Sequence, residues 1–143
     1  MSTIFERLDA LEATVNILIN ELVQLEDVIA DTGWITLPLA TGITAYNESN
    51  IPQYRKIGDL VVIRGTVKGV TARNTVVATL PEGYRPTKAN PYPQNTSSIT
   101  NGIATMSRVV VTTTGEIQIQ GITDGASYGA DKWFPIATMY LVD

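Results

Sequence analysis

The first 31 residues carry an unbroken heptad repeat of apolar side chains, spaced alternately three and four residues apart. A 3.5-residue repeat of this length keeps one side of a helix apolar and turned toward a partner helix. A lone amphipathic helix packing on its own domain usually has a wider stripe that drifts toward a 3.6-residue repeat. The repeat therefore predicts a self-associating coiled-coil stalk. Its a and d positions form the predicted trimerisation seam, which continues from Met1 through Ile4, Leu8, Leu11, Val15, Leu18, Leu22, Leu25 and Ile29.

Both ends of the predicted helix carry local signals. Thr3 and Glu6 have the spacing of a capping box, in which each side chain satisfies a free backbone N–H group of the other residue. Gly33 is placed where a glycine in the left-handed conformation closes a helix. The sequence therefore predicts a helical stalk domain over residues 1–32, joined almost without linker to the rest of the chain.

The number of helices in the bundle follows from apolar residues outside the seam. Phe5 and Ile19 occupy e positions and Val28 occupies a g position, and burying such side chains favours three helices. Leucine at d with β-branched residues at a leaves a dimer as the alternative. Ile17 and Val23, at c and b, stay outside even in a trimer. They are either scattered exposed apolar residues or a docking surface for a larger assembly.

Composition excludes several classes of function. The chain of 143 residues has no cysteine and no histidine, so thiolate chemistry and histidine-based catalysis or metal binding are absent. No apolar run is long enough to span a membrane, and the polar, acidic start is unlike a signal peptide. The first 31 residues contain seven acidic residues and one basic residue, and the remainder is close to neutral. Neither part is basic enough to predict a nucleic-acid interface.

After Gly33 the period of the apolar residues changes from 3.5 to 2, which predicts a second, mainly β domain over residues 33–143. Short strands separated by turn residues at this spacing are typical of a β-sandwich or jelly-roll-like head. Proline-rich residues 81–95 and glycine-rich residues 123–132 are expected to form loops. The predicted strands cover residues 34–37, 41–46, 53–57, 59–69, 75–80, 103–112, 117–120 and 134–142.

The last predicted strand is apolar on both of its faces. Such a strand lies either in the centre of a sandwich or against a neighbouring subunit. One face carries Ile136, Tyr140 and Val142, and the other carries Ala137, Met139 and Leu141.

Catalysis is poorly supported by the residues of the head. Asp124 and Asp131 share one loop and are the only pair that suggests a glycosidase, but a loop of this length fixes no distance between them. The chain has no phosphate-binding glycine loop, no nucleophile elbow and no calcium-loop ladder of oxygen ligands. We therefore expect no enzymatic activity, no cofactor and no metal site.

Binding is better supported, because several aromatic residues stand among polar loop residues. Aromatic faces stack on sugar rings while amides bind the hydroxyl groups. Tyr92, Asn95 and Tyr128 are accordingly the predicted saccharide contacts. Trp133 and Tyr140 flank the last strand and are expected to be core residues instead.

A series of segments in the head resembles a known family. Residues 54–65 read YRKIGDLVVIRG, residues 80–86 read LPEGYRP, and Gly115, Trp133 and Tyr140 follow in the same order. This series is similar to the C-terminal head domains of tailed-bacteriophage fibre and receptor-binding proteins, over about residues 34–143. The shared residues are turn glycines, strand residues and a proline-bounded loop, so no saccharide contact is carried over.

The resemblance implies a homotrimer of jelly-roll-like heads on a short helical bundle, in the virion, at a tail fibre, tail tip or capsid surface. Such heads commonly bind host cell-surface saccharides, and the stalk would contact other virion proteins. Family members usually follow a long tail-attachment region, whereas this stalk starts at Met1. A capsid-attached head fibre or decoration protein with a mainly structural role is therefore the alternative.

Overall fold

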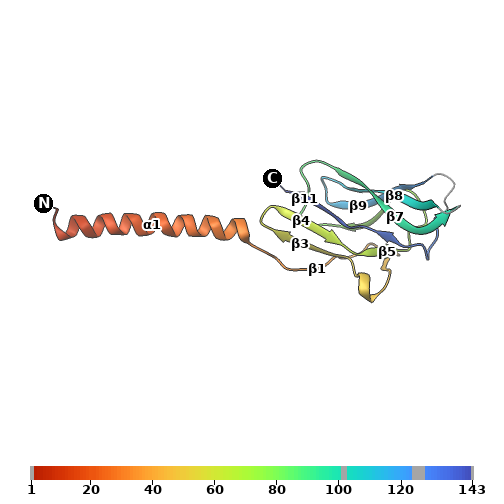
Figure 1. The fold of residues 1–143 in the computed structure, drawn as a ribbon, viewed down its shortest axis with the longest axis horizontal. Coiled ribbons are helices and arrows are strands. Elements are labelled where there is room, and N and C mark those ends of the chain that lie inside the picture. Colours follow the sequence, from red (N-terminus) through yellow and green to blue (C-terminus); the bar gives the residue numbers. More distant parts are fainter. Residues whose placement is uncertain (1, 101–102, 124–127, 143) are drawn as a thin grey trace.

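A long N-terminal helix extends away from a β sandwich in the computed structural model, which describes residues 2–100, 103–123 and 128–142 (Figure 1). The helix, α1, runs over Ile4–Ile29. The predicted capping box is confirmed, since the Thr3 hydroxyl accepts a hydrogen bond from the Glu6 N–H and the Glu6 carboxylate accepts one from the Thr3 N–H, both 3.1 Å long. Met1 and the side chain of Val28 lie outside the described residues.

The helix ends at Ile29, so the prediction that Gly33 closes it is wrong. Ala30 is already extended, and its carbonyl accepts a hydrogen bond of 2.8 Å from the Gly58 N–H. Asp31 forms an antiparallel bridge with Ile57 in the head. Pairing with the head thus replaces a further helical turn. Gly33 does have a positive φ of 67°, but it lies within the extended connection.

An ion pair between Asp31 and Arg55 also joins the end of the stalk to the head, with 2.8 Å between Arg55 Nε and Asp31 Oδ1. Hydrogen bonds from Arg55 and from the Gly33 N–H lower the pKa of Asp31 from 3.8 to about 2. Because the pKa in the folded state lies below its value in the unfolded state, this contact stabilises the fold above pH ~4 and ceases to do so as the pH falls toward ~2. Asp31→Asn should therefore lower the urea midpoint at neutral pH, and this difference should shrink steadily as the pH falls from about 4 toward 2. A difference that persists undiminished at low pH would contradict this prediction.

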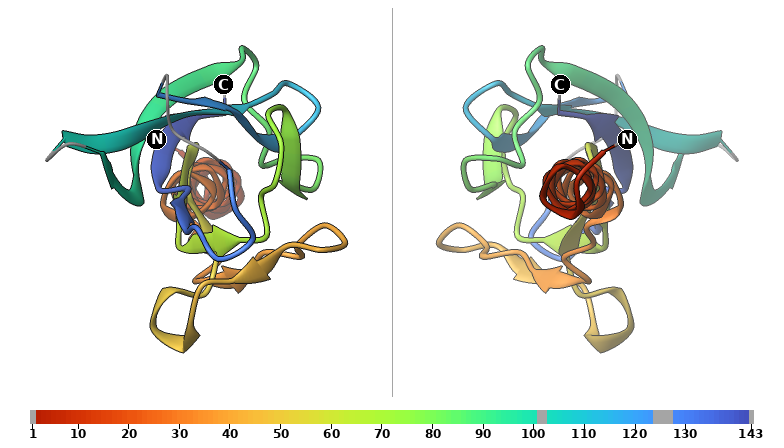
Figure 2. Two further views of the ribbon diagram at one scale, coloured as in Figure 1. Left: turned by 90° about the vertical axis from the view of Figure 1, so that its right-hand side faces the viewer. Right: turned by 90° about the vertical axis from the view of Figure 1, so that its left-hand side faces the viewer.

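The described residues of the head form three antiparallel sheets in two layers (Figures 1 and 2). The sheet nearest the helix contains β1 (Ile35–Thr36), β3 (Gln53–Ile57), β4 (Leu60–Arg64) and β11 (Thr138–Leu141), in that order. A small sheet of β10 (Phe134–Pro135), β5 (Thr66–Lys68) and β2 (Thr44–Ala45) continues this layer. The opposing sheet has the order β6 (Thr75–Thr79), β9 (Glu116–Ile122), β8 (Ile103–Val111) and β7 (Asn90–Thr100).

The core fills the space between the layers. Val61 and Ile63 of β4 are buried while Arg64 is exposed, as the predicted alternation requires. Phe134 and Ile136 reach the same core from the C-terminal segment. The opposing sheet contributes the fully buried Val77, Val109, Val111, Ile117 and Ile119. The prediction of a mainly β sandwich after one helix is confirmed.

Three predicted element boundaries are wrong. β7 begins at Asn90, inside the segment that we expected to be a loop. The predicted strand 59–69 is divided into β4 and β5 at Gly65, and the last strand is divided into β10 and β11. The two divided strands bend where the chain passes from one sheet to another. β7 instead forms because its segment pairs with the edge of the opposing sheet.

β11 is the edge strand of its sheet among the described residues. Of the two positions expected for an apolar last strand, this excludes the centre of the sandwich and leaves contact with a neighbouring subunit as a prediction. The β11 side chains Met139 and Leu141 are 64% and 59% exposed. The register sets Leu141 beside Leu60 and Leu60 beside Ile57, which forms an apolar row across three strands. We call Ile57, Leu60, Val62, Met139 and Leu141 the outer apolar face.

Candidate functional site

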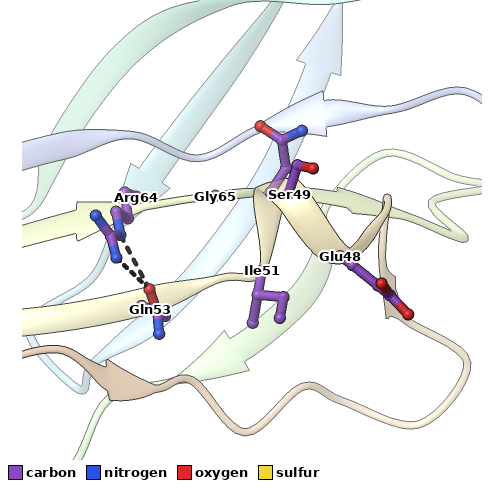
Figure 3. A pocket seen from close by; sticks show the side chains of 7 residues that line it. Glu48, Ser49, Ile51, Gln53, Arg64 and Gly65 are labelled. Atoms are coloured by element: carbon purple, nitrogen blue, oxygen red, sulfur yellow. Dashed lines mark hydrogen bonds between the residues drawn. The ribbon is translucent and has the colours of Figure 1, made fainter.

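A hollow of about 420 Å³ lies between a short 3-10 helix, η1 (Glu48–Asn50), and the facing ends of β3 and β4 (Figure 3). Its size is in the range of ligand-binding pockets in proteins. It is lined by Glu48, Ser49, Asn50, Ile51, Gln53, Arg64 and Gly65, and we call it the η1 hollow.

The turn that forms one wall of the hollow is organised by Asn47. Its side-chain oxygen accepts hydrogen bonds from the Ser49 N–H, at 3.1 Å, and from the Asn50 side-chain amide, at 2.9 Å. Asparagine favours such turns because its short side chain can replace a backbone acceptor. The turn therefore presents three consecutive polar side chains, all exposed.

Gly65 forms the base of the hollow and can hardly be another residue. Its φ is +115°, a conformation that side chains other than glycine's rarely adopt. A Cβ at this position would lie 2.4 Å from Pro52 Cα. The absence of a side chain thus allows β4 to turn into β5 directly against Pro52.

The second wall is a polar cluster built on two neighbouring strands. Gln53 and Arg64 are paired across β3 and β4, and the side-chain Oε1 of Gln53 accepts hydrogen bonds from Arg64 Nε and Nη2 at 3.0 and 2.6 Å (Figure 3). The guanidinium of Arg64 also lies 3.8 Å from the centre of the Trp34 ring, close enough for a cation–π interaction. The cluster is thus held in place before any ligand arrives.

The η1 hollow has the chemistry of a binding site for a polar molecule. It offers hydroxyl, amide, guanidinium and carboxylate groups, and Ile51 supplies a small exposed apolar surface. Glu48 is the one carboxylate among the described residues that line it, and these residues offer no carboxylate pair for acid–base catalysis. Within the described part of the chain, no three acidic residues approach one another closely enough to hold a metal ion.

None of the predicted saccharide contacts is among the described residues that line this hollow. Tyr92 is on β7, its side chain is largely buried, and its hydroxyl donates a hydrogen bond of 3.0 Å to the Ile136 carbonyl. Burial, with a smaller effect of Tyr140, raises the pKa of Tyr92 strongly. Asn95 is exposed farther along β7, and Tyr128 stacks on Phe134 with 6.4 Å between ring centres. Their role as saccharide contacts remains a prediction.

The two residues that we expected in the core are both partly buried. Tyr140 donates a hydrogen bond of 2.6 Å to the Tyr84 carbonyl, and burial raises its pKa. Trp133 packs against Tyr46, with 5.7 Å between ring centres and a tilt of 45°. Asp131 is exposed, and Asp124 lies outside the described residues.

The LPEGYRP segment connects the two layers of the sandwich. Arg85 donates a hydrogen bond to the Leu80 carbonyl at 3.0 Å, and Lys56 donates one to the Gly83 carbonyl at 2.9 Å. The Tyr84 ring meets Tyr54 edge-on at 4.9 Å. These contacts agree with the interpretation of the segment as structural.

The sequence does not predict the η1 hollow, because residues 47–52 read NESNIP and have the composition of an ordinary turn. A usable signal was present, since four polar residues in a row, Asn47 to Asn50, exceed what one turn requires. The contribution of Arg64 was not visible, because only the register of β3 and β4 brings it beside Gln53.

Comparison with known proteins identifies the head. Residues 28–134 match the family model described as the YomR C-terminal beta sandwich domain. The chain belongs to this family. No curated protein sequence matches the chain.

Two solved structures share the fold of this member of the YomR C-terminal beta sandwich family. The receptor binding protein gp15 of Listeria phage PSA is 20% identical and superposes with a TM-score of 0.62, over 100% of this chain and 82% of that one. The head domain of the lactococcal phage bIL170, described with the receptor binding domains of lactococcal phages, is 16% identical with a TM-score of 0.51, over 76% and 96%. The resemblance to phage receptor-binding heads is therefore confirmed, and at these identities the likeness is one of fold.

Proposed function

We propose that the protein is a virion component, a homotrimeric receptor-binding spike whose β head binds a saccharide of the host surface. The observation that carries this proposal is the combination of a sandwich head, in the fold of two phage receptor-binding proteins, with a helix whose apolar seam stays exposed among the described residues. The stalk (residues 1–32) would assemble the trimer and the head (residues 33–143) would meet the host.

The trimer is supported by exposed apolar surface on the helix. Ile4, Leu11 and Leu18 are each more than half exposed in the single chain. Large apolar side chains in such a row are costly to leave in water, and mark an interaction site. Phe5 and Ile19, outside the seam, are also more than half exposed, which favours three helices over two.

The outer apolar face of the head supports the same assembly. It lies where the stalk enters the head, because Ile57 pairs with Asp31 directly after the helix. The apolar seam of α1 and the row from Ile57 to Leu141 are thus neighbouring surfaces. We propose that they form one continuous contact between copies of the chain.

Ile17 and Val23 support attachment of the stalk to other virion proteins. Both are at least half exposed and lie at heptad positions that a trimer leaves uncovered. This contact would serve a tail fibre or tail tip, and it would serve equally a capsid-attached fibre or decoration protein. Binding of host cells by the full-length protein separates the two, since a purely structural protein would not adsorb to any susceptible host.

The η1 hollow is our proposed saccharide site, since its preformed amide, hydroxyl and guanidinium groups match the hydrogen-bonding needs of sugar hydroxyls. We propose a non-catalytic role, because the described residues that line the hollow include one carboxylate and no second group positioned for acid–base chemistry.

Ser49→Trp is expected to reduce adsorption of the full-length protein to host cells at least tenfold. Ser49 is exposed at the rim of the hollow, and within the described chain its backbone N–H rather than its hydroxyl makes the local hydrogen bond. An indole should therefore fill the hollow and leave the fold intact. The measurement is cell binding of fluorescently labelled protein at several concentrations.

The matched control is Thr113→Trp, which adds the same side chain at an exposed position of the hairpin between β8 and β9. It should bind cells like the wild type. Equal binding by Ser49→Trp and the wild type would place the receptor site elsewhere on the head.

A further inference from the structure

A second hollow, of about 350 Å³, lies on the outer side of the opposing sheet, across the sandwich from the outer apolar face. It forms at an irregularity of β8 and β9, where Arg108 pairs with Gly121 and Val109 pairs with Ile119. Gln120 is the extra residue of this bulge. The hollow is lined by Arg73, Asn74, Arg108, Gln120 and Gly121, and we call it the arginine hollow.

The two arginines of this hollow differ from the other arginines of the head. Arg55 binds Asp31, Arg64 binds Gln53, and Arg85 binds the Leu80 carbonyl. The side chains of Arg73 and Arg108 make no hydrogen bond or ion pair with any described residue. No described carboxylate lines the hollow either. Two unpartnered guanidinium groups thus share one concave surface with two side-chain amides.

The surface next to Arg108 is apolar. A shallow cavity of about 390 Å³ adjoins the arginine hollow and is lined by Pro91, Tyr92, Pro93 and Arg108. Pro93 pairs with Arg108 on the neighbouring strand, so both cavities share this arginine. A ligand that spans them would meet an apolar surface at one end and positive charge at the other.

We infer that the arginine hollow binds an oxyanion carried by a sugar, a carboxylate or a phosphate ester, with the C–H face of the sugar resting on Pro91 and Pro93. Guanidinium groups donate parallel hydrogen bonds that match the geometry of both oxyanions. Asn74 and Gln120 supply further donors. The formal charge of −4 makes a nucleic acid an unfavourable ligand for the chain. This inference rests on the proposed function. It adds to the η1 hollow a second binding site on the opposing sheet, for an acidic group of the host saccharide.

The test uses the full-length protein and three probes: inorganic phosphate, glucuronate and glucose. Two-dimensional NMR of the backbone and of the arginine Nε–H groups should show saturable shifts at Arg73, Arg108 and Gly121 with one or both anions and none with glucose. Arg73→Gln combined with Arg108→Gln should weaken binding of that anion at least tenfold. Which anion binds more tightly identifies a phosphate-bearing or a uronic-acid-bearing saccharide.

Two matched controls isolate the hollow. Lys88→Gln removes a positive charge from another exposed position of the head and should leave anion binding unchanged. Gly121→Leu should fill the hollow without changing its charge, and the fold should tolerate it because a Cβ at this position meets no atom within 4 Å. Its control is Gly129→Leu, which adds the same side chain at another glycine with open space and should leave anion binding unchanged. Equal shifts with glucose, or anion binding that survives the double arginine substitution, would overturn the inference.

Adsorption to host cells distinguishes failure of this inference from failure of the proposed function. Loss of adsorption in the double arginine variant, with Lys88→Gln unaffected, supports the inference. Undiminished adsorption of the double variant overturns the arginine hollow as a receptor site and leaves the receptor-binding function standing. A wild-type protein that binds anions but adsorbs to no susceptible host contradicts the proposed function instead.

Discussion

Replacing Leu18 and Leu22 together by aspartate is expected to convert the proposed trimer into monomers at micromolar concentration. Both side chains are more than half exposed in the single chain, so the substitution should leave an isolated chain able to fold. In the bundle each would place a carboxylate in an apolar layer without a partner, at a cost of several kcal/mol per buried charge. Sedimentation velocity measures the outcome directly.

The matched control is Asn20→Asp with Gln24→Asp, which adds the same two charges to the same helical turns. Both residues lie outside the a and d positions and are exposed in α1. This variant should sediment like the wild type. If the leucine variant also remained trimeric, the head would hold the assembly, and Met139→Glu with Leu141→Glu should then dissociate it.

Gly65→Ala is expected to destabilise the head by about 3 kcal/mol, which lowers the melting temperature by about 10 °C for a domain of this size. Two effects add at this residue. The φ of +115° is unfavourable for alanine, and the new Cβ would lie 2.4 Å from Pro52 Cα and 2.7 Å from Pro52 N. Backbone atoms cannot move aside as a flexible side chain can. Urea unfolding at one fixed protein concentration measures the change, because association would otherwise shift the midpoint.

Substitutions at two other glycines distinguish the effect of backbone strain at a positive φ from the effect of a steric clash with Pro52. Gly83 has a φ of +90° but open space where a Cβ would stand, so Gly83→Ala should cost about 1 kcal/mol. Gly121 has an ordinary φ and open space, so Gly121→Ala should be nearly neutral. If Gly65→Ala and Gly83→Ala were equally mild, the segment at Pro52 would be able to move away from Gly65.

The stalk illustrates which features of a helix are readable from sequence. Its start at Thr3 depends on groups three residues apart, and the capping box formed as predicted. Its end depends on Gly58 and Ile57, far along the chain, which pair with Ala30 and Asp31. The residues around the helix end cannot show that the head pairs with Ala30 and Asp31 in place of a further helical turn. The helix therefore ends at Ile29, before the position that Gly33 suggested.

β7 shows a similar limit. Pro91 and Pro93 lower the local preference for a strand, since proline lacks the N–H that a central strand needs. β7 is nevertheless a strand because it lies at the edge of its sheet, bonded on one side only to β8. Whether a segment is at an edge or in the centre is a property of the whole sheet.

By itself, the sequence determined the class of the molecule: a helix with an apolar seam, followed by a mainly β head without cysteine or histidine. These properties follow from periodicity and composition, which are local and additive. Only the tertiary structure decided which polar and charged side chains line the same hollow. The η1 hollow joins residues 48–53 to Arg64, and the arginine hollow joins Arg73 to Arg108 and Gly121. Strand register and a β-bulge create both hollows, because they set which distant side chains become neighbours.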